Sequence, residues 1–488
     1  MKKADDEQAA KLDFSDAVPW PAFRGMLAKT GEAMKKISVC IILSAACVFC
    51  HAGDSDSDGN PQLNVVLVSL NALRADHLKA YGYGTETAPN ISRLAGESAV
   101  FEHAVAQSHW TLPSLASLFT SRYVHSHGVY ERGGKVSEKE LALAEILKKH
   151  GYRTAAFTGG LDMIGQYGLN QGFDVYSDET DNKPMGTLRD IMPRALKWLA
   201  GSRDEKFFLF IDAYDIHPPF DRPEPGSNDP GYSGVLKGLL LDYNLLRDFK
   251  NGVLFLNGKE VRLTKDDIDY INSRYDAGIA YADRFIGELL ARIDELKLSE
   301  KTIIIFTAEH GEELADHGSF DRFGRKNLYD EAIRVPLFIK SPHMKLKGTR
   351  VMVQAQLIDI MPTVLDLLGI PVNNEAQGVS LVPVIEDGKT GKDFSRHGYS
   401  EASFHKWAMR TGKWKLICEN GRYELYDLLR DKAELNNLAV AKPSVVYELV
   451  QKLLEWRRKT RTDKSPDDTK IVLTDEMKSK LKEAGYWR

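Results

Sequence analysis

The sequence predicts an α/β fold, in which a large, mainly parallel sheet is flanked by helices and followed by a small antiparallel sheet with one helix. Three observations support this prediction. Short apolar runs rich in β-branched and aromatic residues recur along the chain, helical periodicities separate them, and strict alternation appears only near the C-terminus. Strands that are buried on both faces form continuous apolar runs, and their alternation with helices is typical of parallel sheets.

The apolar runs are the predicted strands of the large sheet, and polar residues follow each of them. The runs are Asn64–Leu70, Tyr152–Thr158, Phe207–Ile211 and Thr302–Thr307. The segments with helical periodicity are Ser137–His150 and Asp267–Leu296. Since ligand sites of such sheets lie at the carboxyl ends of the strands, we expect the polar residues after the runs to share one edge.

The C-terminal part has a different pattern. Residues 406–429 alternate between apolar and polar side chains around a turn at Glu419-Asn420-Gly421, which predicts antiparallel strands. Val445–Arg458 has the apolar spacing of an amphipathic helix. We therefore expect a boundary near residue 386, between a main domain over 62–385 and a small subdomain over 386–488.

The composition is that of an ordinary globular protein. The 488 residues are 43% hydrophobic and 27% charged, and 65 Lys and Arg stand against 69 Asp and Glu, for a net charge of −4. Proteins that bind nucleic acids generally carry a basic excess that neutralises phosphates. The sequence therefore predicts no nucleic-acid partner.

An apolar stretch at residues 37–50 follows Met34-Lys35-Lys36 and has the features of an export signal. The stretch is too short for a helix that crosses a hydrocarbon core of about 30 Å. Cleavage after Ala52 is the main interpretation. Lipidation at Cys47 and an uncleaved membrane anchor at 37–50 remain alternatives.

The segments around this signal follow from it. Residues 34–52 form the signal peptide or anchor, and the polar residues 53–61 form a linker to the folded body. Residues 1–33 are a charged N-terminal extension that is absent from the protein if translation starts at Met34. We expect an exported protein, periplasmic or extracellular, with membrane anchoring as the alternative.

Seven segments occur in a fixed order along the body of the chain. They are LNALRADHLKAYGYGTETAPNISRLAGES, HWTLPSLASLFTSRYVHSHGV, DIHPPF, FTAEHGEELADHG, LYDEAIRVPLFIKSP, LIDIMPTVLDLLGI and ELYDLLRDKAELNNLA. With these segments the chain resembles the sulfatase family of the alkaline phosphatase-like superfamily, from about residue 62 to residue 460. The resemblance implies an alkaline phosphatase-like fold and makes 62–385 a sulfatase-like catalytic domain.

The resemblance also implies roles for individual residues. The cation-binding positions of the family correspond to Asn71, Glu309 and His310. Thr111 lies at the position of the nucleophile. His217 would bind the anionic oxygens of the ester or protonate the leaving group, and Arg325 and Lys326 would bind the same anion.

Some of these positions depart from the family pattern. Asn71 and Ala72 stand where the family has acidic residues, so Glu309 is the one carboxylate expected at the cation. The expected cofactor is one weakly bound divalent cation, Ca²⁺, Mn²⁺ or Zn²⁺, and the nitrogen of His310 favours the softer ones, such as Zn²⁺ or Mn²⁺. Threonine cannot be oxidised to the formylglycine aldehyde of typical sulfatases, so no formylglycine is expected and Thr111 itself would attack. A structural alternative makes Thr111 the N-cap of a helix.

The function expected from this resemblance is hydrolysis of sulfate or phosphate esters at the cell envelope, with a small molecule or a glycan as substrate. Two alternatives remain open. One is a catalytically inactive member that binds sulfated or anionic glycans, and the other is a phospho-group transferase of the envelope. Bound metal and turnover distinguish the hydrolase from the inactive member, and a requirement for a lipid acceptor identifies the transferase.

Overall fold

A computed structural model describes residues 63–180, 183–221, 231–246, 249–320, 327–344, 348–386, 396–461 and 474–483. The elements below belong to one compact unit, made of residues 62–419 and 423–488. The expected extension, signal and linker, residues 1–61, lie outside the described residues, and so does the apolar stretch at 37–50. No helix among the described residues has the length and apolar character needed to cross a membrane.

The core of the fold is an eight-stranded sheet with the strand order β12-β2-β11-β9-β1-β6-β4-β5. Its strands are β1 (Asn64–Leu70), β2 (Ala99–Phe101), β4 (Arg153–Thr158), β5 (Val175–Ser177), β6 (Phe207–Ala213), β9 (Thr302–Thr307), β11 (Leu337–Lys340) and β12 (Arg350–Val351). The strands from β9 to β5 are parallel, while β11 runs antiparallel to both β9 and β2. The predicted strands and the mainly parallel sheet are thereby confirmed.

The middle of this sheet is completely buried. Every residue of β1, β6 and β9 is buried, as expected for apolar runs that are covered on both faces. The register pairs Ser69 of β1 with Asp212 of β6 on one side and with Thr307 of β9 on the other. These three strands consequently end side by side.

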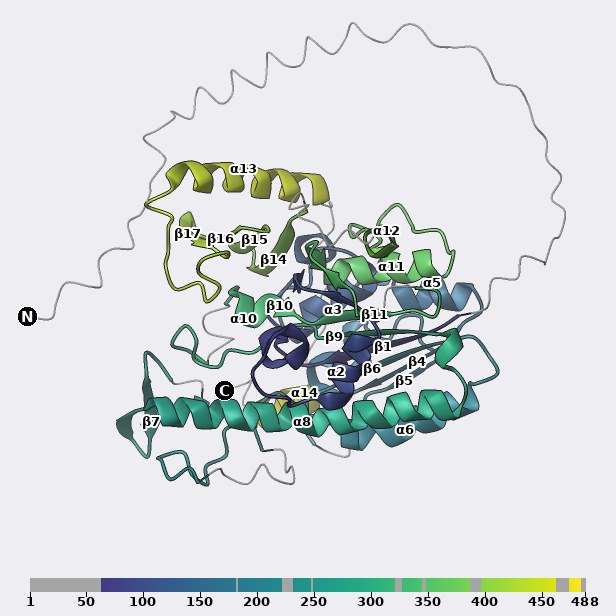
Figure 1. Ribbon diagram of the computed structural model, residues 1–488, viewed down its shortest axis with the longest axis horizontal. Helices are drawn as coiled ribbons and strands as arrows, with labels where there is room; N and C mark the ends of the chain where they lie inside the picture. Colours follow the sequence, from purple (N-terminus) through teal and green to yellow (C-terminus); the bar gives the residue numbers. More distant parts are fainter. Residues whose placement is uncertain are drawn as a thin grey trace, which may run out of the picture. The chain divides into compact units, whose positions relative to one another are not determined.

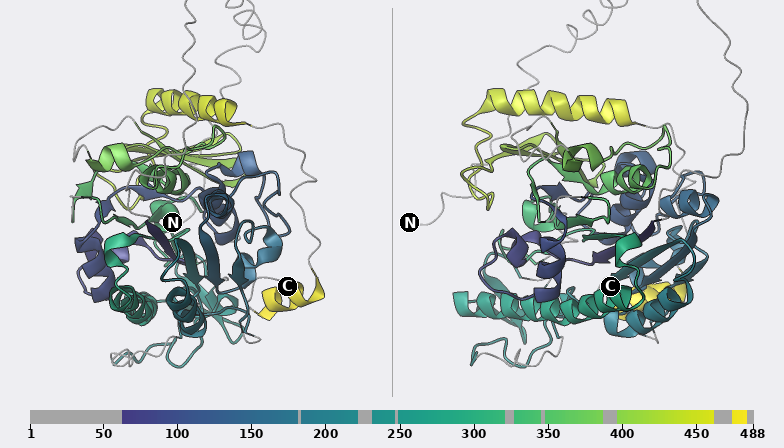
Figure 2. Two further views of the ribbon diagram at one scale, coloured as in Figure 1. Left: turned by 90° about the vertical axis from the view of Figure 1, so that its right-hand side faces the viewer. Right: turned by 45° about the vertical axis from the view of Figure 1, so that its right-hand side comes forward.

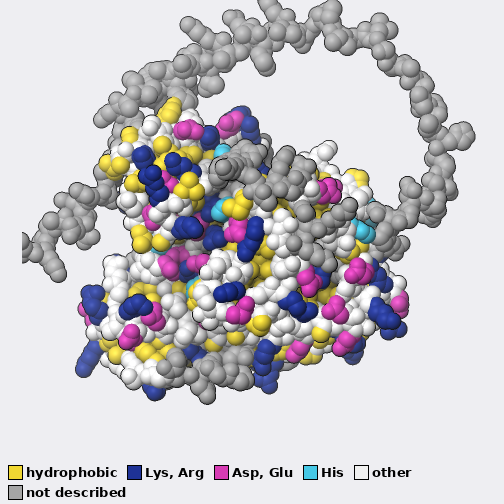
Figure 3. All heavy atoms as spheres, viewed as in Figure 1, with side chains coloured by type: hydrophobic (Ala, Val, Ile, Leu, Met, Phe, Trp, Pro, Cys, Tyr) yellow, Lys and Arg dark blue, Asp and Glu magenta, His cyan; other side chains and the backbone are white. Residues whose placement is uncertain are grey.

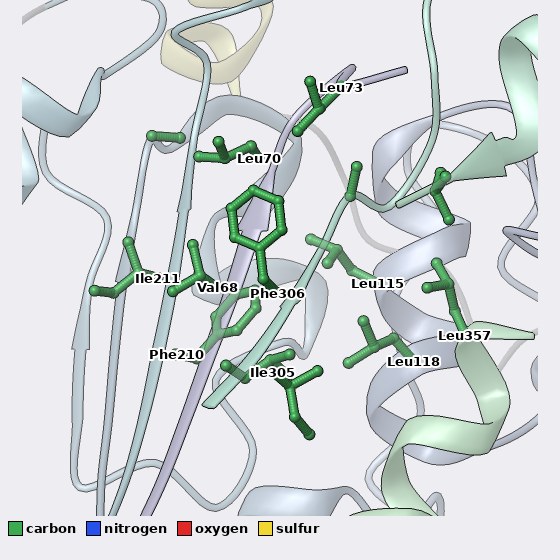
Figure 4. Packing of buried hydrophobic residues seen from close by; sticks show 14 of the residues in the cluster. Val68, Leu70, Leu73, Leu115, Leu118, Phe210, Ile211, Ile305, Phe306 and Leu357 are labelled. Atoms are coloured by element: carbon green, nitrogen blue, oxygen red, sulfur yellow. The ribbon is translucent and has the colours of Figure 1, made fainter. Parts of the chain in front are cut away.

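Helices cover both faces of the sheet (Figure 1). On one face lie α3 (Thr111–Thr120), α5 (Leu143–Lys149) and α11 (Ile360–Leu367), and on the other α2 (Pro89–Gly96), α6 (Leu188–Gly201) and α8 (Lys265–Glu295). Leu115 and Leu118 of α3 pack against the sheet beside Phe306 and Phe210 (Figure 4). The layers form the α/β architecture that the sequence predicts.

The predicted helices are only partly correct. The helix expected over Asp267–Leu296 is α8, but the one expected over Ser137–His150 begins only at Leu143. Glu140 is buried, and its carboxylate lies 3.3 Å from Nε of Arg122. This ion pair draws the segment before Leu143 toward the interior. The Glu145 side chain then accepts a hydrogen bond from the backbone N–H of Ala142 at 2.9 Å and starts the helix.

The C-terminal residues form a second, four-stranded antiparallel sheet covered by one helix (Figure 2). Its elements are β14 (Gly398–Ser403), β15 (Lys406–Arg410), β16 (Trp414–Glu419), β17 (Arg422–Asp427) and α13 (Pro443–Thr460). Leu416 and Leu425 of this sheet share a hydrophobic core with Leu449 and Leu453 of α13. The sequence predicts these elements except β14, and the boundary near residue 386 stays a prediction.

Short elements complete the described structure. They are β3 (Ala104–Val105), β7 (Val253–Leu256), β8 (Lys259–Arg262), β10 (Arg334–Val335), β13 (Ala355–Gln356), α4 (Val124–His127), α7 (Tyr243–Leu246), α10 (Asp330–Ile333), α12 (Val382–Glu386) and α14 (Asp475–Glu483). On the face seen in Figure 3, basic and acidic side chains are interspersed, in keeping with the near balance of 65 basic and 69 acidic residues.

A buried charge network joins the second sheet to α10. Lys415 of β16 is fully buried, and its Nζ lies 2.8 Å from the carboxylate of Asp330 and 3.1 Å from that of Glu434. Arg410 pairs with the same Asp330 at 3.0 Å. Although burial opposes it, the charges of Arg410 and Lys415 hold the pKa of Asp330 well below its usual range.

Lys415→Met should strongly destabilise the protein, because it leaves Glu434 without its cationic partner in the interior. We expect the free energy of unfolding, measured with urea, to fall by about 3–5 kcal/mol. Lys452→Met is the control, since Lys452 and Glu448 form an exposed pair that is worth at most about 0.5 kcal/mol. Similar small losses in both variants would contradict a structural role for the buried network.

Candidate active site

The residues at the predicted nucleophile and cation positions come together in the structure. Asn71 follows β1, Glu309 and His310 follow β9, and Thr111 is the first residue of α3. The Thr111 hydroxyl lies 3.1 Å from Nδ2 of Asn71 and 3.2 Å from Nε2 of His310. All of these side chains are buried, so the cluster is shielded from bulk water.

The strand register explains why these residues meet. Because Ser69 and Thr307 are paired between β1 and β9, Asn71 and Glu309 leave the sheet at the same edge. Helix α3 lies on the face of the sheet to which Phe210 points, as its contact with Phe119 shows. The N-terminus of α3 therefore brings Thr111 to that edge.

Thr111 is not the N-cap of its helix. The N-cap is Trp110, and Thr111 occupies the first helical position without a side-chain capping bond. Its hydroxyl is instead shared between Asn71 and His310, which lie outside the helix. The N-cap interpretation was wrong because tertiary contacts, not the local backbone, determine where this hydroxyl points.

The protonation of His310 follows from its contacts. Nδ1 lies 2.6 Å from the carbonyl oxygen of Gly311, which can only accept, so Nδ1 carries the proton. A neutral His310 ring then offers Nε2 as an acceptor, and the Thr111 hydroxyl can donate to it. The same hydroxyl oxygen accepts a hydrogen bond from Nδ2 of Asn71, so both neighbours orient Thr111.

A second buried carboxylate, which the sequence analysis did not include, belongs to Asp212 at the end of β6. Asp212 is paired in register with Ser69, and Ser69 donates a hydrogen bond of 2.8 Å to Glu309. Burial and the nearby Glu309 carboxylate raise the pKa of Asp212 well above its ordinary value. An acidic residue in the apolar run FFLFIDA was the signal in the sequence, but the predicted strand ended one residue earlier.

The buried cluster around Asn71, Asp212 and Glu309 is rich in acceptor atoms and fits a cation. In the described part of the chain, Oδ1 of Asn71 and both carboxylate oxygens of Asp212 are buried without a hydrogen-bond partner. Oε1 of Glu309 lies 3.3 Å from Nε2 of His310, so two acceptors face each other when the ring is neutral. Among the described residues no group of three His, Cys, Asp or Glu side chains is placed to hold a metal, so such a site must include another oxygen ligand.

His217 lies just beyond β6 and is fully buried. Its Nδ1 donates to the carbonyl oxygen of Pro218 at 2.9 Å, and its Nε2 lies 3.5 Å from the hydroxyl of Tyr243. The Tyr243 hydroxyl is also 3.3 Å from the carboxylate of Glu312, in the segment that carries Glu309. These contacts connect His217 to the loop after β9.

Arg325 and Lys326 lie outside the described residues.

Comparisons with known proteins identify the family of the chain. Residues 63–370 match the family model described as Sulfatase, and residues 315–460 match the C-terminal domain of N-sulphoglucosamine sulphohydrolase. Arylsulfatase K of Mus musculus is 24% identical over 444 residues, which cover 81% of this chain and 79% of that protein. N-acetylglucosamine-6-O-sulfatase of Bacteroides thetaiotaomicron is 23% identical, over 89% of this chain and 93% of the relative.

Solved structures share the fold. One is the structure of a protein in complex with its substrate D-glucosamine-2-N,6-O-disulfate. That protein is 20% identical to this chain, and the match covers 83% of this chain and 99% of the other, with a TM-score of 0.66. Another is phosphonate monoester hydrolase of Agrobacterium radiobacter, 23% identical over 82% of this chain and 96% of its own, with a TM-score of 0.66. The α/β fold with a large mixed sheet and a small C-terminal sheet is therefore that of sulfatases and their relatives.

Ser69→Ala tests the electrostatics of the buried acid pair. The substitution removes the hydroxyl that donates to Glu309, and a buried carboxylate without its donor costs about 1–3 kcal/mol. We expect the free energy of unfolding to fall by that amount in urea titrations with a chelator present. Ser92→Ala removes a bond of 2.9 Å to Glu86 that is exposed, and should change stability by less than about 0.5 kcal/mol. Equal losses of unfolding free energy in the two variants would argue against a buried Glu309 carboxylate that depends on the Ser69 donor.

Proposed function

The chain belongs to the sulfatase family, and from this we propose that it is a hydrolase of sulfate esters in which Thr111 is the nucleophile. The observation that supports this most directly is the Thr111 hydroxyl, which is buried between Asn71 and His310 at the carboxyl ends of β1 and β9. A hydroxyl held beside an acceptor nitrogen is the arrangement of an activated nucleophile.

The contacts of Thr111 suggest how the reaction proceeds. Oγ1 of Thr111 attacks sulfur, and the bond between sulfur and the oxygen of the leaving alcohol breaks. The hydroxyl proton moves to Nε2 of His310, and Asn71 Nδ2 stabilises the charge that develops on the nucleophile. His217 donates a proton to the leaving oxygen. Water then attacks sulfur, the bond between sulfur and Oγ1 breaks, Oγ1 takes back its proton from His310, a proton of the water restores His217, and sulfate leaves.

The residues also fit the divalent cation that the family implies. Oδ1 of Asn71 and the carboxylate of Glu309 would hold it, with His310 as the further ligand that the sequence predicts. A divalent cation, when bound, neutralises the charge of the ester oxygens and of the nucleophile. Because threonine cannot give the aldehyde, the proposal includes no formylglycine. Arg325 and Lys326 are proposed to bind the same anionic oxygens.

The proposed substrate is a sulfated sugar or a glycan built from such sugars. Support comes from the N-acetylglucosamine-6-O-sulfatase relative and from the related structure that holds a disulfated glucosamine. A phosphorus ester is the second candidate, because the phosphonate monoester hydrolase shares the fold and a threonine hydroxyl can attack phosphorus as well as sulfur.

We also propose that the protein is exported to the periplasm or beyond the cell. The basis is the sequence of residues 34–52 alone, with its lysines, apolar stretch and small residues before Gly53. Sequencing the N-terminus of the mature protein from an envelope fraction should identify Gly53 as the first residue. A mature protein that retains residues 37–50 would instead support a membrane anchor.

Thr111→Ala should abolish turnover, whereas Thr111→Ser, which keeps a hydroxyl, should retain part of it. We expect kcat to fall by at least about a thousandfold in the alanine variant. The measurements use 4-nitrophenyl sulfate, 4-nitrophenyl phosphate and bis(4-nitrophenyl) phosphate with added Ca²⁺, Mn²⁺ or Zn²⁺, and the best probe identifies the ester class. Thr120→Ala, at the other end of α3, is the control and should leave kcat within about twofold.

If the Thr111→Ala variant turned over the probes as fast as the wild-type protein does, Thr111 would be excluded as the nucleophile. No turnover of any probe by the wild-type protein with any of these cations would favour the inactive, glycan-binding member of the family.

A further inference from the structure

In the proposed reaction, Nε2 of His310 has two roles: it accepts the proton of Thr111, and it binds the cation. Its Nδ1 proton is committed to the carbonyl of Gly311, so Nε2 is the one ring atom that can accept a proton or hold a cation. The Thr111 hydroxyl lies 3.2 Å from this Nε2. A lone pair that binds a cation cannot also take the proton of Thr111. If His310 is the base, the cation needs a different ligand.

We propose that Asp212, and not His310, is the second charged ligand of the cation site, together with Glu309 and Oδ1 of Asn71. This inference rests on the proposed function only in assuming that a divalent cation binds in this pocket. It assigns His310 to the proton of Thr111 and the two carboxylates to the cation.

The position of Asp212 supports this assignment. Residues paired in register across parallel strands point to the same face of the sheet, so Asp212 lies on the same face as Ser69. Ser69 in turn contacts the Glu309 carboxylate. That face is also the one covered by α3, since Phe210, two residues before Asp212, packs against Phe119. Asp212 therefore lies on the face of the sheet that α3 covers, at the end of β6.

The surroundings of Asp212 leave its charge uncompensated. The Ser69 hydroxyl has one proton and lies 2.8 Å from Glu309, so Asp212 and Glu309 compete for this single donor. Both Asp212 oxygens are buried and make no hydrogen bond of good geometry with the described residues, and the nearby backbone N–H groups of Asn71 and Ala213 offset only part of the effect of burial on its pKa. A buried carboxylate in this situation is strongly unfavourable unless a cation or a proton neutralises it.

Other buried aspartates show what a structural carboxylate looks like in this protein. Asp283 accepts hydrogen bonds from the backbone N–H groups of Asn90 and Ile91 at 3.1 and 2.8 Å. Asp359 accepts from Arg396 at 2.8 Å and from the backbone N–H of Gln356 at 2.8 Å. Asp212 makes no hydrogen bond of comparable geometry in the described structure, and this difference sets it apart from the aspartates that stabilise the fold.

The assignment changes the expected cation. One carboxylate and one imidazole, the set expected from the sequence alone, favour Zn²⁺ or Mn²⁺. Two carboxylates and an amide oxygen form an all-oxygen set with a charge of −2, which suits harder cations such as Ca²⁺ or Mn²⁺ better than Zn²⁺. In this chain Ala72, just after β1, offers no ligand, and the second carboxylate comes from the neighbouring strand β6.

Isothermal titration calorimetry of the metal-free protein with MnCl₂ and CaCl₂ tests the assignment without any assay of turnover. Asp212→Asn should weaken binding of both cations by at least about tenfold, since affinity rises with the number of charged ligands. His310→Gln should bind Mn²⁺ within about threefold of wild type while it loses turnover. Asp283→Asn, which removes a fully bonded buried carboxylate, is the matched control and should bind as wild type does.

Thermal unfolding of the same variants keeps the test independent of misfolding. Without metal, Asp212→Asn should melt at or above the temperature of the wild-type protein, because it removes one of two adjacent buried charges. Added Mn²⁺ should raise the melting temperature of wild type and His310→Gln but not of Asp212→Asn.

Two results would overturn the inference. One is wild-type affinity in Asp212→Asn, and the other is a loss of binding in His310→Gln as large as that in Asp212→Asn. Loss of Mn²⁺ affinity in Asp212→Asn with no wild-type turnover of any ester would contradict the proposed function and leave the assignment of Asp212 standing.

Discussion

The site of this protein is set by the parallel register that holds β1 between β6 and β9. The register aligns Asp212, Ser69 and Thr307 in one row across the sheet. Because side chains in such a row share a face, the row fixes where Asn71 and Glu309 leave the strands. A shift by one residue would turn Asp212 and Ser69 to the opposite face and disperse the pocket.

This arrangement destabilises the folded state electrostatically, because it buries two carboxylates close together. Asp212 and Glu309 are buried next to one another, and Ser69 gives its one hydroxyl proton to Glu309. At another buried acid, Asp330, the cations of Lys415 and Arg410 compensate the charge. Uncompensated charge is typical of a site that receives a ligand, because stability is given up where function requires it. A cation would remove this imbalance and stabilise the folded state.

The sequence predicted the fold more completely than the site. Long apolar runs such as Asn64–Leu70 and Thr302–Thr307 predict strands correctly because burial on both faces leaves no room for polar residues. The helix expected from Ser137 was too long, since a buried ion pair between Glu140 and Arg122 overrides local periodicity. Such tertiary contacts are not visible in a pattern of single residues.

The same limit applies to the site. Asn71, Thr111, Glu309 and His310 were predicted from their resemblance to family positions, and the structure places them together. Asp212 was missed because its role depends on the pairing of β6 with β1, which no local motif encodes.

The most direct test of the account is a crystal structure of the protein grown with Mn²⁺, examined by anomalous scattering at the manganese edge. One anomalous peak bounded by oxygen atoms of Asn71, Asp212 and Glu309, with His310 Nε2 facing Thr111, is the result expected. A peak coordinated by His310 without Asp212, or crystals with no manganese in this pocket, would contradict it.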